Sequence, residues 1–217
     1  YFARSSIKSL EALALLESGA AERFQFSDAE LALAIASHAG EACHTETARR
    51  TLERLGLGVR HLLCGAHAPS DARTREALRA RGEAPSALHN NCSGKHVAFL
   101  ALAKQLSVAP EEYLAPDSAG QRQVRAAIAE LSGVPEAALR PAIDGCSAPT
   151  YRLPLRNLAM AFARLTHPPA LSGTRRAQAQ RLTRVAAEFP ELIGGSQRNL
   201  DTELLKASRG RLFAKIG

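Results

Sequence analysis

The sequence predicts a mostly helical α+β protein. Three observations indicate this: apolar residues recur at helical spacing through most of the chain, capping residues mark helix ends, and strand-like segments are few and short. At 217 residues, of which 46% are hydrophobic, the chain can bury a substantial core. No repeat, low-complexity tract or flexible linker divides it, so we expect a single domain over residues 1–217.

Helices are predicted where apolar periodicity meets a start or a stop signal. The first spans about 5–18 and is closed by Gly19. The second spans about 27–37 and opens with the capping box Ser27-x-x-Glu30, in which each side chain can bond to the other residue's backbone N–H. Further helices are expected at 42–55, 71–81, 94–106, 118–131, 155–165 and 174–188.

Strands are predicted at 59–63, 141–146 and 211–216, where short apolar runs lack helical spacing. Pro168-Pro169 predicts a break between two helices. The segment 211–216 ends at Gly217 without a further strand to pair with it. We therefore expect the chain to be a fragment of a larger fold, with an incomplete sheet.

The cysteine content indicates a reducing compartment. Four cysteines, Cys43, Cys64, Cys92 and Cys146, are too few to build a disulfide scaffold in a chain of this length. No apolar run approaches the roughly 18 residues of a membrane span, and the N-terminus at Tyr1 lacks a signal-peptide pattern. We expect a cytoplasmic protein without a membrane partner.

The net charge of +7 would attract anions, including phosphates or an acidic small substrate. Arginines cluster at 73–81 and 175–184, so a basic helical module that binds nucleic acid is one hypothesis. The chain has no Trp and 5% aromatic residues, which leaves little for base stacking. We favour solvated helix faces for these arginines and expect no nucleic-acid partner.

The segment His89-Asn90-Asn91-Cys92-Ser93-Gly94-Lys95-His96 is the most informative stretch of the chain. It combines a thiol, an amine, two imidazoles, two amides and a hydroxyl just before the apolar run 97–100. So many polar groups suit a loop that leads into the first turn of a helix better than they suit a core. Sites are often built on loops that a rigid element holds.

A second candidate is Ser5-x-x-Lys8, whose spacing places a hydroxyl and an amine on one helix face. A neutral lysine could take the serine proton and activate it for acyl transfer. Together with Lys215-Ile216-Gly217, this pattern also allows a metal-free serine acyl-transferase of the β-lactamase or penicillin-binding type. The pattern alone is weak, because an N-cap serine followed by an exposed lysine is the commoner explanation of such a spacing.

Cys92 and Cys146 form a third candidate. Two thiolates from distant segments would make a soft site suited to zinc, and a third ligand would leave a position open for substrate. No Cys-x-x-Cys pair supports this, so two small buried side chains or a disulfide between them stay open as alternatives. At Ser37-His38-Ala39-Gly40-Glu41, polar groups could turn outward into a site, or Gly40 could simply end a helix.

Taken in order along the chain, the motifs resemble the asparaginase II family, the rhizobial-type or class 3 L-asparaginases. The segments that carry this resemblance are Arg4-Ser5-Ser6-Ile7-Lys8, Ala36-Ser37-His38-Ala39-Gly40-Glu41, Cys64-Gly65-x-His67, His89 to His96, Asp144-Gly145-Cys146 and Asp201-Thr202. The resemblance runs over nearly all 217 residues, and the block from His89 to His96 is its most specific part.

The resemblance implies a fold, a reaction and an assembly. The fold is that of serine β-lactamases and glutaminases, in which a helical lobe packs on an antiparallel sheet, and strands before Tyr1 and after Gly217 would then be missing. The reaction is hydrolysis of L-asparagine to L-aspartate and ammonia, which makes the chain a hydrolase of linear amide C–N bonds. A homodimer is expected from the family as well.

The resemblance also assigns roles to individual residues. Ser5 would be the nucleophile with Lys8 as its base, and Ser37 with Lys215 would form a second Ser-Lys pair. The zinc ligands would be Cys92, Lys95 and Cys146, and His96 and Asp144 would orient these ligands. The groups that bind the substrate would be Arg4, His38 and Asn91.

Overall fold

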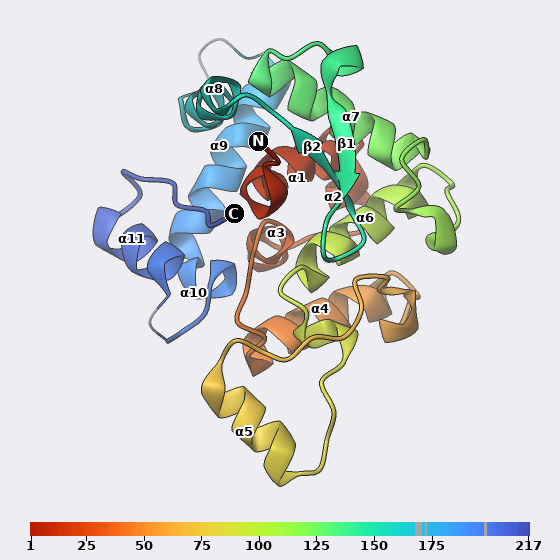
Figure 1. Cartoon of the computed structure of the whole chain (residues 1–217), viewed down its shortest axis with the longest axis vertical. Helices are drawn as coiled ribbons and strands as arrows, with labels where there is room; N and C mark the ends of the chain where they lie inside the picture. The colour runs from red at the N-terminus through yellow and green to blue at the C-terminus, as the bar shows by residue number, and fades with distance from the viewer. Residues whose placement is uncertain (168–170, 172, 198) are drawn as a thin grey trace.

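The fold is an assembly of helices around two central ones, with a small hairpin on one side (Figure 1). The computed structural model describes residues 1–167, 171, 173–197 and 199–217. The α-helices are α1 (Lys8–Glu17), α2 (Ala20–Arg23), α3 (Asp28–Ala34), α4 (Ala42–Arg54), α5 (Ala72–Ala80), α6 (Ser93–Gln105), α7 (Ala119–Ser132), α8 (Leu155–Thr166), α9 (Gly173–Glu188), α10 (Pro190–Ile193) and α11 (Leu200–Ser208). Short 3-10 helices are η1 (Arg4–Ile7), η2 (Val59–His61), η3 (Ala87–His89), η4 (Pro110–Glu112) and η5 (Glu136–Ala138).

Every predicted helix is present, with ends that differ by a few residues. The capping box of α3 forms as expected, because the Ser27 hydroxyl accepts the N–H of Glu30 and the Glu30 carboxylate accepts the N–H of Ser27. The predicted first helix is divided, since Ser5 lies in η1 and α1 begins at Lys8. Three short helices, α2, α10 and α11, were not predicted.

The strand predictions were partly wrong. Strand β1 (Arg140–Ile143) pairs in an antiparallel manner with β2 (Pro149–Arg152), which was not predicted, and Pro141 lies opposite Tyr151. Segment 59–63 instead forms η2 followed by a turn, and 211–216 has no strand partner among the described residues. The break predicted at Pro168-Pro169 lies outside the described residues. The chain is therefore α+β as expected, while the β-lactamase-like topology stays a prediction.

The core is built around α1 and α6, and both helices are buried on nearly all sides. All residues from Lys8 to Leu16 are buried in α1, and all from Ser93 to Ala103 are buried in α6. Helix α1 packs against α7, α6 and α9, which explains why a largely apolar helix occupies the centre. A polar side chain on either helix is therefore carried into the interior.

Gly94 allows α6 to approach α3 closely. A Cβ atom at this position would lie 2.1 Å from the backbone oxygen of Leu33, which is far inside van der Waals contact. The close approach brings the start of α6, with Cys92 and Lys95, next to the segment that follows α3. That segment contains Ser37, so one glycine helps to set the distance between two predicted site motifs.

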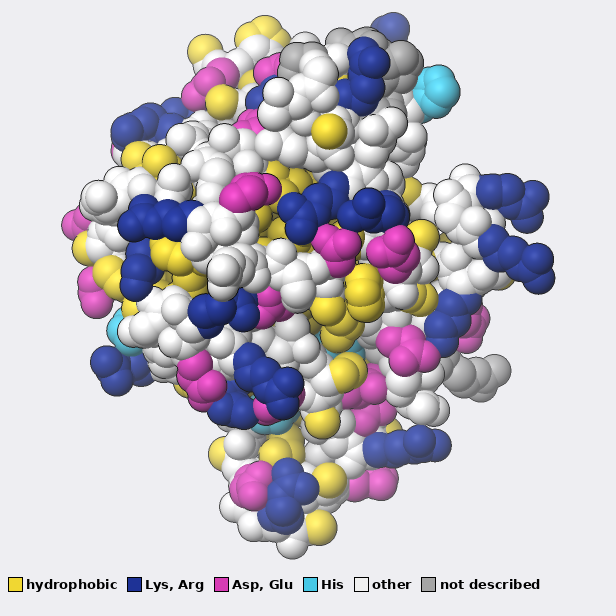
Figure 2. All heavy atoms as spheres, turned by 180° about the vertical axis from the view of Figure 1, so that it is seen from behind, with side chains coloured by type: hydrophobic (Ala, Val, Ile, Leu, Met, Phe, Trp, Pro, Cys, Tyr) yellow, Lys and Arg dark blue, Asp and Glu magenta, His cyan; other side chains and the backbone are white. Residues whose placement is uncertain are grey.

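The surface mixes both signs of charge. The face in Figure 2 shows Lys and Arg side chains interspersed with Asp and Glu. On α9, Arg175 pairs with Glu17 and Arg181 pairs with Asp28, so part of the predicted basic cluster is neutralised. In the part of the chain that the structure describes, no helix combines the length and apolar character that crossing a membrane requires.

Candidate active site

A small cavity brings together residues from four distant motifs. Its volume is about 170 Å³, and its lining includes six of the predicted site residues: Arg4, Ser5, Asn91, Cys92, Asp144 and Cys146. These side chains come from η1, from the loop before α6 and from the turn between β1 and β2, and the fourth motif contributes His67 to the same lining. Because the packing of α1 and α6 fixes two of these segments, their meeting is a consequence of the helical core.

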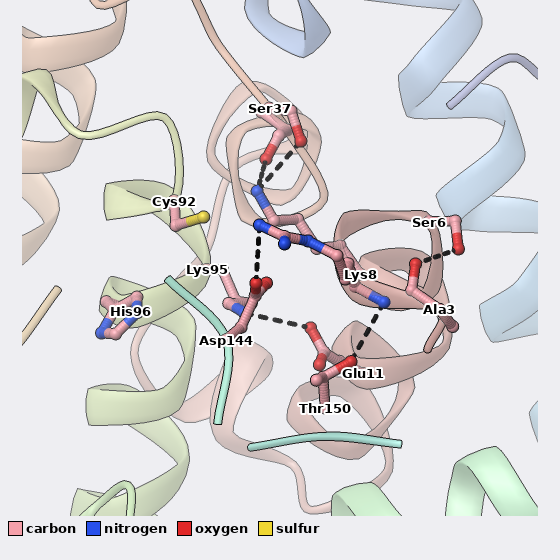
Figure 3. Close-up of polar contacts among 12 residues, drawn as sticks. Ala3, Ser6, Lys8, Glu11, Ser37, Cys92, Lys95, His96, Asp144 and Thr150 are labelled. Atoms are coloured by element: carbon pink, nitrogen blue, oxygen red, sulfur yellow. Dashed lines mark hydrogen bonds and ion pairs between the residues drawn. The ribbon is translucent and has the colours of Figure 1, made fainter. Parts of the chain in front are cut away.

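Lys8 enters this region from α1 and is fully buried. Its Nζ donates to the backbone oxygen of Ala36 at 2.6 Å, to the Ser37 hydroxyl at 3.1 Å and to the backbone oxygen of Asn91 at 3.2 Å. Figure 3 shows Lys8 directed toward the Ser37 segment. Three acceptors satisfy the three donors of an ammonium group, so the amine is fixed in position.

Lys215 reaches the same hydroxyl from the other side. Its Nζ donates to Ser37 Oγ at 2.7 Å and to the backbone oxygen of Ile216 at 2.6 Å. Burial of the amine, followed by the nearby charge of Lys8, lowers the pKa of Lys215 from 10.5 to about 7, while Asp201 opposes this shift. A lysine with such a pKa can act as a base near neutral pH.

Ser5 lines the cavity, but its hydroxyl makes no hydrogen bond to Lys8 in the described residues. The backbone before it is constrained, because Arg4 has a φ of +49° and its N–H donates to Thr150 Oγ1 at 3.0 Å. The neighbouring Ser6 hydroxyl instead donates to the backbone oxygen of Ala3. The structure therefore presents Ser5 to the cavity and joins Lys8 to Ser37.

Cys92 and Cys146 meet at the cavity wall. All four cysteines are free, so the disulfide alternative is not formed. A hydrogen bond from Cys146, together with the charges of Lys8 and Lys95, lowers the pKa of the Cys92 thiol although burial opposes this. The Cys92 thiol also contacts Asn91 Oδ1 at 3.1 Å. Cys92 can therefore release its proton readily, whereas the same contact and burial raise the pKa of the Cys146 thiol.

Lys95 lies behind the thiols on α6, facing a buried carboxylate. Its Nζ is 3.8 Å from Glu11 Oε2, and both side chains are almost completely buried (Figure 3). Burial opposes the charge of Lys95, but Glu11 and the two thiols outweigh it and raise the pKa of the lysine. Glu11 Oε2 has no hydrogen-bond partner among the residues that the structure describes, so the interior next to Lys95 holds an unsatisfied acceptor there.

The donor set fits a zinc ion if Lys95 contributes. Within the described ranges, no three side chains of His, Cys, Asp or Glu gather in a way that could hold a metal ion. Two soft thiols at the cavity wall and an amine on the same turn as Cys92 are ligand types that zinc accepts. The amine must then be neutral, which a bound dication would favour.

Arg4 and Asp144 form an ion pair at the mouth of the cavity. Arg4 Nη2 lies 3.0 Å from Asp144 Oδ1, and the Arg4 side chain is 63% exposed while that of Asp144 is 5% exposed. Asp144 Oδ1 also accepts the N–H of Gly145. The exposed guanidinium is thus held next to the cavity, where it could receive a carboxylate.

The two predicted site histidines are both buried away from the cavity lining. His38 accepts the N–H of Gly40 at Nδ1, and its Nε2 lies 2.9 Å from Ser93 Oγ. His96 Nδ1 lies 2.5 Å from the Tyr113 hydroxyl, and its Nε2 has no partner. Burial lowers the pKa of both histidines, so they are neutral groups in the packing around the site.

Several residues at the site were not predicted. Glu11 was overlooked because a lone acid in an apolar helix usually faces solvent. Asn90 organises the loop, since its side chain donates to the backbone oxygen of Cys64 and accepts the N–H of Cys92. Gly217 packs against η1, where a Cβ atom would lie 2.3 Å from the Ser6 nitrogen. Asp201 belonged to a quoted motif but had no assigned role.

Lysines around a serine, next to paired thiols and a small polar cavity, are groups from which a hydrolytic active site can be built. The whole chain, residues 1–217, matches the family described as L-asparaginase II, and the protein belongs to that family. No curated protein matches the chain. The family resemblance noted in the sequence is therefore confirmed, and family membership makes the protein an amidohydrolase.

Proposed function

We propose that the protein hydrolyses L-asparagine to L-aspartate and ammonia. The observation that carries this proposal is the Ser37 hydroxyl held between Lys8 and Lys215, next to the cavity that Ser5 lines. Amide hydrolysis needs a nucleophile, a base that is neutral near pH 7 and a means of binding a small charged substrate. Family membership supplies the substrate class.

Ser5 is the proposed nucleophile because it lines the cavity and, among the described residues, no hydrogen bond occupies its hydroxyl. In a linked transfer, Lys8 takes the Ser5 proton as it gives one of its own protons to Ser37 Oγ, and Ser37 gives its hydroxyl proton to Lys215, whose lowered pKa suits it as the final acceptor. The direct contact between Ser5 and Lys8 then forms only with substrate bound, as often happens in catalytic sites. The helix start at Ser5 favours negative charge on the tetrahedral intermediate.

The cavity supports recognition of both charged ends of an amino acid. Arg4 offers an exposed guanidinium to the substrate carboxylate, and Asn91, which also lines the cavity, offers an amide. Cys92, Lys95 and Cys146 would hold a zinc ion, which would supply a positive centre for binding the amino-acid end of the substrate. His38 is too enclosed to reach the substrate without a change of conformation.

Ammonia release from L-asparagine tests this proposal. We expect Ser5→Ala to lower kcat/KM by about 10³-fold or more, because the covalent step is lost. Ser9→Ala is the matched control, since Ser9 is a buried serine on α1 whose hydroxyl has no partner. Full turnover by Ser5→Ala together with loss in Ser37→Ala would move the nucleophile to Ser37. Absence of ammonia release from the unmodified protein would reject the function.

The metal-free β-lactamase-type alternative is not favoured, because the family match is to L-asparaginase II. It would require acylation of Ser5 by a penicillin, which the mass of the intact protein would reveal. The cytoplasmic location and the homodimer stay predictions. Light scattering of the purified protein tests the dimer directly.

A further inference from the structure

Asp201, in the first turn of α11, is bonded to the segment that carries Lys215. Its Oδ2 accepts the backbone N–H of Ile216 at 2.9 Å, and the residue is only 4% exposed. Lys215 in turn donates to Ser37 Oγ. A buried carboxylate therefore fixes the backbone directly after the residue that meets the serine.

Helix α11 does not need the Asp201 carboxylate for its own capping. The Asn199 side chain already accepts the N–H groups of Asp201 and Thr202. Glu203, which is exposed in the same turn, also places a negative charge at the helix start. The burial of Asp201 and its hydrogen bond to Ile216 thus indicate that its carboxylate stabilises the terminal segment and not the helix itself.

The charges around Lys215 come from three elements. Lys8 on α1 and Lys95 on α6 disfavour the charged amine, while Asp201 on α11 and the Cys92 thiol favour it. Asp201 is therefore placed to affect both where the amine lies and how readily it holds a proton. The first effect acts through the backbone of Ile216, and the second acts through space.

We propose that Asp201 is a positioning residue, which holds the Lys215 segment against Ser37 through the N–H of Ile216 and balances the charge of the lysine cluster. This inference rests on the proposed function, because it assigns Asp201 to the Ser37–Lys215 pair of that same site. Asp201 is not among the residues that line the cavity, and within the described ranges no hydrogen bond joins it to Ser37, so its contribution passes through Lys215.

Two substitutions separate the two effects. Asp201→Asn keeps an oxygen acceptor for Ile216 and removes the charge, whereas Asp201→Ala removes both. Glu203→Gln, an equal loss of charge on the exposed face of the same helix turn, is the control. The measurement is kcat/KM for ammonia release from L-asparagine between pH 5.5 and 9.5, with urea unfolding of each variant.

For Asp201→Asn we expect the acidic limb of the profile to move to lower pH by about half a unit to one unit, because the neutral amine forms more easily without the carboxylate. Its plateau should stay within about threefold of the unmodified enzyme. For Asp201→Ala the plateau should fall about tenfold or more, because the Lys215 backbone loses its anchor. Glu203→Gln should change neither limb nor plateau.

An Asp201→Asn profile that superposes on that of the unmodified enzyme, with a normal plateau for Asp201→Ala, would overturn the inference. If Asp201→Ala does not fold, the position of the acidic limb in the kcat/KM profile of Asp201→Asn tests the inference by itself. Lys215→Met separates this failure from that of the proposed function. Full activity of Lys215→Met would overturn both the proposed function of Lys215 as a base and the inference about Asp201, because activity would then not depend on the lysine that Asp201 positions. An inactive Lys215→Met beside unaffected Asp201 variants would overturn only the inference.

Discussion

The helical core and the C-terminal segment 209–217 hold the same serine in different ways. On the core side, Lys8 is fully buried in α1 and bonds to three acceptors. On the other side, Lys215 belongs to a segment without regular secondary structure, anchored by Asp201 and by the contact of Gly217 with η1. One amine is fixed inside a buried helix, and the other lies on an irregular segment whose Phe213 and Ala214 pack against the core.

The difference indicates how the two lysines divide the chemistry. A helix inside a packed core gives a precise position that costs much to change. A segment without regular secondary structure can open more cheaply than a core helix, and such opening would let its buried lysine exchange protons with solvent. The lowered pKa of Lys215, about 7, suits that exchange.

Replacing each lysine in turn should have the largest effect. Both Lys8→Met and Lys215→Met should lower kcat/KM by about 10³-fold, since each removes a proton-transfer group. Only Lys8→Met should also cost stability, by about 1–3 kcal/mol, because the carbonyls of Ala36 and Asn91 lose their donor. Kinetics and urea unfolding of both variants check this. Equal losses of stability would contradict the proposed difference between the two regions.

Two glycines allow the same comparison through the backbone. Gly94→Ala would force α6 away from Leu33 and should destabilise the fold by about 3 kcal/mol. Gly217→Ala would push the terminal segment away from Ser6, so kcat/KM should fall about tenfold while stability changes by less than about 1 kcal/mol. Gly58→Ala, with open space at its Cβ, is the control for both. Thermal unfolding combined with kinetics checks the contrast.

The sequence predicted the helical core well because its signals are local. Long apolar repeats and the Ser27 capping box determine α3, α6 and their neighbours without knowledge of the tertiary structure. The predicted strand at 59–63 fails because nearby side chains take over the backbone bonds: His61 Nδ1 accepts the N–H of Gly58, and the Tyr113 hydroxyl accepts that of Leu63. Strand pairing depends on distant partners, which a local pattern cannot show.

The candidate site was predictable only as a set of residue types. Motif resemblance identified Ser37, Lys215 and the two thiols, but not that Lys8 would bond to Ser37 rather than to Ser5. Glu11 could not be found from sequence, because only the packing of α1 against α6 shows which face of α1 is buried beside Lys95. Long-range contacts of this kind carry no local signature.

Addition of zinc tests whether one ion binds both the turn after β1 and the start of α6. Cys146 lies in that turn and Cys92 at the start of α6, so a shared ion would stabilise the folded state. Zinc at 100 times its Kd should raise the free energy of unfolding by about 2.7 kcal/mol. Cys92→Ala and Cys146→Ala should abolish this gain, and Cys43→Ala, which removes an exposed thiol, should retain it. If zinc still raises the free energy of unfolding of Cys92→Ala and of Cys146→Ala, the ion binds at another site.

The last contrast concerns how the stability of the folded protein depends on pH. The folded protein lowers the pKa of Lys215 from 10.5 to about 7, so between these values the unfolded chain binds more protons at this residue than the folded chain does. The contribution of Lys215 to stability therefore rises with pH across this window, by at most about 1.4 kcal/mol per pH unit. Urea unfolding at pH 7.5, 8.5 and 9.5 measures the slope. Lys215→Met should remove it, while Lys206→Met, at an exposed lysine, should leave it unchanged. If the slope persists in Lys215→Met, another group titrates in this window and the terminal lysine is not the one tuned by burial.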